Sequence, residues 1–193
     1  LPFYFGFRSQ AGGILPNPVF ATQLNQFTVL FGVLLVPALG WLLWESARAR
    51  RALNWRLGAL TGPGVLVGMV ITCGVLTTVI LLIPEFSELR GPTSLLGTLS
   101  TEENVRIILR RRLLENPSTT IILVGTLMLA GGMLPRKTTR AQMDADATPF
   151  SALLLGVGAL LTLCPEFLYL RDSFGSRMNT IFKFYYQAWV LWS

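Results

Sequence analysis

The residues best suited to chemistry gather near the end of the chain, within residues 165–192. This stretch carries three cations, Arg171, Arg177 and Lys183, and two carboxylates, Glu166 and Asp172. Ionisable groups beside apolar runs are costly to hold at a membrane boundary, so we interpret them first as functional. Arg presents a planar fork to phosphate oxygens and Lys a compact charge, so the cations predict a site for phosphate or pyrophosphate. The carboxylates could hold a divalent metal that bridges such a phosphate, or act as a base.

A second interpretation of the same stretch stays open, namely that its charges form buried ion pairs that fix helix packing. If the segment is helical, Asn179, Lys183 and Gln187 share one polar stripe, because residues four apart lie on the same face. Lys183 falls inside an apolar run. It must therefore extend back to the membrane interface, pair with one of the two carboxylates, or bind an anion.

Glu85 belongs to a short internal repeat and is a third acidic candidate. Residues 84–90, PEFSELR, match residues 165–171, PEFLYLR, at five of seven positions. Each copy follows an apolar run, and we expect its proline to end a helix because proline cannot continue the backbone ladder. One interpretation is chance similarity in a biased composition. The other is a duplicated helix exit that places a Glu and an Arg at the membrane interface.

The chain as a whole has the composition of a membrane protein. Its 193 residues are 52% hydrophobic and 13% charged, against roughly 25% charged in soluble domains. The net charge of +6 comes from Lys and Arg that flank apolar runs, which indicates membrane topology and not a nucleic-acid partner. The sequence has no His, and its two cysteines lack metal-ligand spacing. A zinc site and a Ser-His-Asp triad are therefore excluded within this sequence.

The apolar blocks predict an all-α fold, a polytopic membrane helix bundle forming one domain over residues 1–193. Five spans are expected, over residues 27–44, 65–83, 118–134, 150–163 and 181–193. Residues 1–26 predict a loop or re-entrant segment at the outer surface. Residues 101–115 predict an amphipathic helix, which is either a solvated element or a site for anionic lipid. Both ends of the sequence look cut, so we expect a piece of a longer protein.

The placement of basic residues predicts how the bundle is oriented. The loops 45–63 and 135–148 are rich in Lys and Arg, and they lie on one side if the spans alternate in direction. Basic loops favour the cytoplasm. The connections 84–117 and 164–180 would then face outward, which predicts a multi-pass protein of the cell (plasma) membrane with its charged stretch on the extracytoplasmic side.

Two strings of this sequence resemble a known family. The run RDSFGSRMNTIFKFYYQAW, with LPFYFGFRSQAGGI at the start, resembles the C-terminal half of the YYY membrane proteins, an uncharacterised multi-pass family of Chloroflexi and some archaea. Its specific element is R-M-N-T-x-F-K-x-Y-Y-Q over residues 177–187. The triple-tyrosine segment that names the family lies upstream and is absent here. The family in turn is similar to GT-C glycosyltransferases, which use sugar donors linked to a lipid phosphate on the outer face.

The resemblance implies the donor-binding part of such an enzyme, with a polyprenyl-phosphate sugar as partner. On chemistry and position, Arg171, Arg177 and Lys183 are then the phosphate contacts, and Glu166 and Asp172 the acidic members of the site. The catalytic acid of these enzymes is expected in a first outer loop outside this sequence, so no catalytic residue is assigned. Two other functions stay open. One is a non-catalytic membrane subunit of a larger bioenergetic or photosynthetic complex, and the other is a transporter built around the repeat.

Overall fold

The computed structural model describes residues 13–48, 53–83, 117–134, 147–171 and 177–193, together with the single residues Arg106, Arg110, Arg112 and Leu114. Several sequence-based predictions lie outside these described residues. They concern residues 1–12, the whole first repeat copy over residues 84–90 with Glu85, the carboxylate Asp172, and most of the helix expected over residues 101–115.

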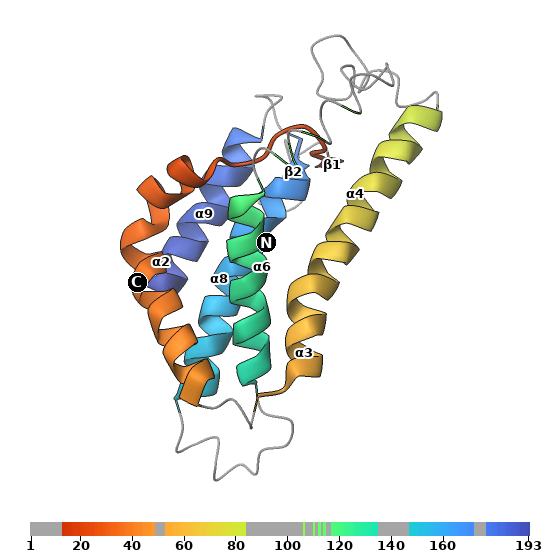
Figure 1. The fold of residues 1–193 in the computed structure, drawn as a ribbon. Coiled ribbons are helices and arrows are strands. Elements are labelled where there is room, and N and C mark those ends of the chain that lie inside the picture. The colour runs from red at the N-terminus through yellow and green to blue at the C-terminus, as the bar shows by residue number, and fades with distance from the viewer. Residues whose placement is uncertain are drawn as a thin grey trace, which may run out of the picture.

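The described part of the chain is a helix bundle, which confirms the all-α membrane fold class. In chain order the elements are β1 (Ile14–Pro16), α2 (Leu24–Arg48), α3 (Trp55–Ala59), the π-helix η1 (Leu60–Gly64), α4 (Val65–Leu82), α6 (Ser118–Met133), α8 (Thr148–Phe167), β2 (Leu168–Leu170) and α9 (Met178–Trp192). Successive long helices alternate in direction (Figure 1). The start of α2, the end of α8 and the start of α9 therefore meet at the end of the bundle where β1 and β2 lie.

Three helical stretches are long and apolar enough to cross a membrane: Leu24–Arg48, Trp55–Leu82 and Thr148–Phe167. The second of these is a continuous helical segment made of α3, η1 and α4. The wider π turn accommodates Pro63, whose ring cannot fit a regular helical turn. Gly62 lets this turn lie directly on α6, since an added Cβ would stand 2.7 Å from Cβ of Met128 and 2.9 Å from the carbonyl oxygen of Val124.

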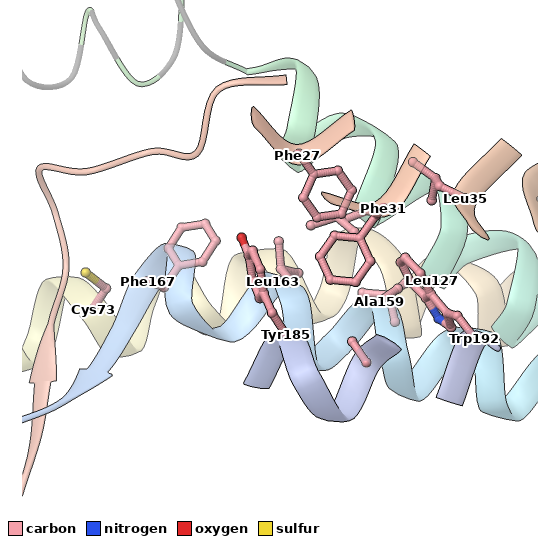
Figure 2. Close-up of a cluster of buried hydrophobic side chains, with 12 residues drawn as sticks. Phe27, Phe31, Leu35, Cys73, Leu127, Ala159, Leu163, Phe167, Tyr185 and Trp192 are labelled. Carbon is pink, nitrogen blue, oxygen red and sulfur yellow. The ribbon is translucent and has the colours of Figure 1, made fainter. Parts of the chain in front are cut away.

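The apolar core lies between α2, α6, α8 and α9 (Figure 2). Phe31 of α2 makes edge-on contacts with two aromatic rings of α9, Tyr185 at 5.1 Å and Trp192 at 5.3 Å between ring centroids. Such pairs add about 0.5–1.5 kcal/mol each beyond the area they bury. Tyr185 is buried with its ring in this core, so its hydroxyl group needs a partner at the core's edge.

A short antiparallel pairing ties the start of the described chain to the segment after α8. β1 pairs with β2 in the register Ile14 with Leu170, Leu15 with Tyr169 and Pro16 with Leu168. From β1 the chain continues as an extended segment, residues 17–23, which crosses the end of the bundle before α2 begins (Figure 1). We call residues 17–23 the strap.

The prediction that Pro165 ends its helix is wrong, because α8 continues to Phe167. The last carbonyl groups of a helix have no partner within it and must be satisfied from outside. Here the carbonyl oxygens of Pro165, Glu166 and Phe167 all accept hydrogen bonds from residues far away in the sequence. These external donors stabilise the final turn that proline alone would weaken.

Candidate functional site

A buried carboxylate forms the centre of the candidate site. The Glu166 side chain at the end of α8 is 1% exposed. Its Oε2 accepts a hydrogen bond of 2.9 Å from the backbone N–H of Thr22, and its Oε1 accepts one from the Thr22 hydroxyl. Oε1 also pairs with Nη1 of Arg177 at 3.3 Å. Both oxygens of the carboxylate are thus occupied by protein donors, as a buried charge requires.

Thr22 of the strap forms hydrogen-bonding contacts with three helices: with α8 through Glu166, and with α9 and α6 as follows. Its hydroxyl lies 3.3 Å from the hydroxyl of Tyr185 on α9, so the buried tyrosine finds its polar partner there. Its carbonyl oxygen accepts a 2.9 Å hydrogen bond from the side chain of Thr119 on α6. A polar network in which each member is satisfied fixes one arrangement of the elements that it joins.

Asn17, at the other end of the strap, caps the end of α8. Its amide Nδ2 contacts the carbonyl oxygens of Pro165 at 3.1 Å and Glu166 at 3.2 Å, and its backbone N–H donates to Phe167 O at 2.7 Å. The same side chain closes a turn within the strap, because Oδ1 accepts from the backbone N–H of Phe20 and Nδ2 donates to Phe20 O. Asn17 is fully buried, and these contacts give hydrogen-bond partners to both the oxygen and the nitrogen of its side-chain amide.

Arg112 lies in the connection between α4 and α6 and donates hydrogen bonds to carbonyl groups of the strap and of α8. Nη1 donates to Asn17 O at 2.6 Å, and Nη2 donates to Glu166 O. The guanidinium carbon lies 4.3 Å from the ring centroid of Phe167, a cation–π contact. Burial lowers the pKa of the Arg112 guanidinium, and the negative charge of Glu166 acts in the opposite direction.

Arg177 directly precedes α9 and completes the site. Its Nη1 donates to Glu166 Oε1, to Phe20 O at 3.3 Å and, more weakly, to Pro165 O at 3.5 Å. Its guanidinium carbon lies 5.8 Å from the centroid of the Phe20 ring. Every hydrogen bond that Arg177 makes to a described residue uses Nη1, and its side chain is 14% exposed. Nε and Nη2 are thus the guanidinium nitrogens that make no hydrogen bond to a described residue.

Comparison with known proteins adds one finding to this geometry. The family model described as "Uncharacterized membrane protein (DUF2298)" matches residues 1–192. The chain belongs to the DUF2298 family. No curated protein and no solved structure matches it. Together with the long apolar helices, membership makes the chain a multi-pass membrane protein that sits in a lipid bilayer.

Among the site residues predicted from the sequence of this DUF2298 protein, the structure brings some together and separates others. Glu166 and Arg177 form an ion pair. Arg171 is exposed at the same end of the bundle, where its backbone N–H donates to Gly13 O. Lys183 is exposed on α9, and Glu166, one of the two carboxylates considered for it, is occupied by Arg177.

The predicted polar stripe of α9 lies mostly on the exposed side of this helix. Asn179, Lys183 and Gln187 follow one another at intervals of four residues in this helix, with Asn179 half-buried and the other two exposed. Sequence reasoning missed Asn17, Thr22, Thr119 and Arg112 as members of the site. Their partners lie 54–149 residues away, so no local pattern could have revealed them.

The charges of the site favour an anion over a metal ion. Within the part of the chain that the structure describes, no group of three or more His, Cys, Asp or Glu side chains could hold a metal. Among the described residues, Arg112 and Arg177 both lie close to Glu166, so two positive charges of this set face one negative charge. Arg171 adds a third cation at the same end. A ligand that carries negative charge would complement this excess.

Proposed function

We propose that this DUF2298 protein forms the donor-binding part of a membrane glycosyltransferase of the GT-C type. The donor is a sugar linked to a lipid phosphate, and it is used on the extracytoplasmic face of the plasma membrane. The observation that carries the proposal is the guanidinium of Arg177 at the end of the helix bundle. Its hydrogen bonds to the described residues all use Nη1, and Nε and Nη2 have no hydrogen-bond partner among those residues.

The arrangement of Arg177 suits a phosphate oxygen. Glu166 and two carbonyl groups fix the position of Nη1, so Nε and Nη2 are oriented before a ligand arrives. Preorganised charged donors bind with less loss of side-chain freedom than mobile ones. An arginine fork that presents two N–H groups matches the geometry of two phosphate oxygens.

Arg171 and Lys183 are the further phosphate contacts in this proposal. Arg171 is exposed at the same end of the bundle. Lys183 lies six residues after Arg177 in α9, about 9 Å along the helix. Its long side chain can extend toward the membrane interface and meet the same headgroup. The lipid chain would then lie along the apolar side chains that α9 exposes beside Lys183, namely Phe182 and Tyr186.

The orientation of the bundle supports an outward-facing site. Arg48 ends α2 and Arg56 lies in α3, so both stand at the end of the bundle opposite Glu166. The connections at that opposite end are rich in basic residues, which favours the cytoplasm. A donor whose lipid phosphate is presented on the outer leaflet would meet the end that holds Arg177.

A second candidate function rests on the surface of α4. In the Trp55–Leu82 span only 11% of the most apolar window is buried within the chain, and Val67, Ile71 and Leu82 are among its exposed apolar side chains. Such a helix can face lipid, or it can pack against other membrane proteins. If α4 packs against other membrane proteins, the chain is a non-catalytic subunit of a larger membrane complex. Mass measurement of the complex extracted from native membranes tests it, because a lone chain contradicts the subunit function.

The binding of an undecaprenyl-phosphate-linked sugar to the full-length protein in lipid nanodiscs tests the main proposal. Arg177→Gln and Lys183→Gln should each weaken binding about tenfold or more, since each removes a hydrogen bond to a charged ligand. Arg56→Gln is the matched control because this exposed arginine lies at the other end of the bundle, and it should change binding less than about twofold. Absence of saturable binding in the wild type, or equal losses in all three variants, would refute the proposal.

A further inference from the structure

We propose that Arg112 is a positioning residue of this site: it locks the strap onto the end of α8 and thereby fixes Arg177 for the anionic ligand. The inference rests on the proposed function and adds a residue to it. Sequence reasoning placed Arg112 among the arginines of a surface helix. The structure instead places its guanidinium between the strap and α8.

One guanidinium joins two parts of the chain that are far apart in sequence. Nη1 bonds to Asn17, 95 residues away, and Nη2 bonds to the carbonyl oxygen of Glu166, 54 residues away. The ring of Phe167 lies against the guanidinium and restrains its plane. A positive group at this place also interacts favourably with the C-terminal end of a helix, where carbonyl oxygens carry partial negative charge.

The contacts that hold Arg177 depend on the same strap. Asn17, which Arg112 holds through its carbonyl oxygen, bonds to Pro165 O and to both backbone groups of Phe20. Phe20 O and Pro165 O are two of the three acceptors of Arg177 Nη1. Loss of Arg112 therefore removes one of the contacts that hold Asn17, and the acceptors that orient Arg177 are then held less firmly.

Arg112 acts through these neighbours and does not bind the ligand itself. Both of its terminal nitrogens are already committed to carbonyl oxygens. Arg177, in contrast, uses one terminal nitrogen for its hydrogen bonds to the described residues. A lysine at position 112 would keep the charge but could not reach two carbonyl groups with a planar fork.

The test measures binding of undecaprenyl phosphate to the full-length protein in nanodiscs. Arg112→Gln and Arg112→Lys should each weaken binding about tenfold, the usual effect of losing hydrogen bonds from a charged donor. Arg112→Ala should lose binding as well and regain part of it when methylguanidinium is added, because the small cation can occupy the vacated place. Arg110→Gln is the matched control, since Arg110 is exposed two residues away, and it should stay within about twofold of the wild type.

The outcomes separate the two proposals. If the wild type binds, Arg177→Gln does not, and Arg112→Lys binds as the wild type does, the role of Arg112 is refuted while the phosphate site stands. If Arg112→Gln lowers only the unfolding temperature and the folded protein keeps its affinity, Arg112 serves stability alone and the inference fails. If the wild type does not bind, the phosphate site itself is refuted. Arg112→Lys, which keeps the charge, supplies the answer should Arg112→Gln not fold.

Discussion

Truncation of Glu166 to alanine is the perturbation with the largest expected effect on stability. The substitution removes the acceptor of the Thr22 backbone N–H, of the Thr22 hydroxyl and of Arg177 Nη1. It therefore leaves a guanidinium without its counter-charge and a buried N–H without an acceptor. Both consequences destabilise the folded state relative to any state in which water can reach these groups.

The size of the expected loss in the free energy of unfolding depends on how deeply the hydrogen-bond donors of Glu166 are buried. Breaking a buried ion pair by removal of one partner costs about 3–5 kcal/mol. Arg177 is 14% exposed, so water can partly solvate it, and its share lies at the lower end. Thr22 is buried, so the loss of the acceptor of its hydrogen bonds keeps the total cost within this range and not below it. We therefore expect Glu166→Ala to lower the free energy of unfolding by about 3–5 kcal/mol. Glu166→Gln keeps the volume and one acceptor, so about 1–3 kcal/mol is expected.

The assay is reversible unfolding of the full-length protein in mixed micelles by sodium dodecyl sulfate. Glu45→Gln is the matched control, because among the described residues the Glu45 side chain has no hydrogen bond or ion pair. It should change the free energy of unfolding by no more than about 0.5 kcal/mol. A cost below about 1 kcal/mol for Glu166→Ala would refute the claim that the network fixes this end of the bundle.

Two further substitutions test the packing around the site in the same assay. Gly62→Ala should cost about 1–3 kcal/mol, because its new Cβ would stand 2.7 Å from Met128 Cβ; Gly74→Ala, with open space around it, should cost nothing, and equal values for the two would contradict the packing of η1 on α6. Tyr185→Phe keeps the ring in the core and removes only its 3.3 Å contact with Thr22. A loss of about 0.5–1.5 kcal/mol is expected, and a loss above about 3 kcal/mol would mean that the hydroxyl serves more than this one contact.

The helical architecture could be predicted because hydrophobic runs decide it locally. α6 occupies Ser118–Met133, where the sequence is mostly apolar and carries no charged residue. A membrane-spanning segment must satisfy its own backbone hydrogen bonds, so such a run has few alternatives to a helix. The end of α8 is the exception to this local rule, because the helix continues past Pro165 to Phe167. Pro165 weakens the ladder locally, but Asn17 and Arg112 supply donors to the following carbonyl groups from elsewhere in the chain.

The membership of the site could be predicted only in part. Glu166 and Arg177 were recognised because charged residues beside apolar runs stand out in a hydrophobic sequence. Arg112 stands in an arginine-rich stretch, and nothing in its immediate neighbours distinguishes it from Arg110, which is exposed. The difference arises from tertiary contacts with Asn17, which lies beyond any local pattern.

The most direct test of the phosphate site is a structure of the full-length protein in nanodiscs with an undecaprenyl-phosphate-linked sugar bound. We predict phosphate oxygens within hydrogen-bonding distance of Nε or Nη2 of Arg177, while Nη1 keeps its ion pair with Glu166. A donor phosphate bound at the opposite end of the bundle, near Arg48 and Arg56, would contradict the proposed site. So would a bound donor that leaves Arg177 in contact with protein atoms alone.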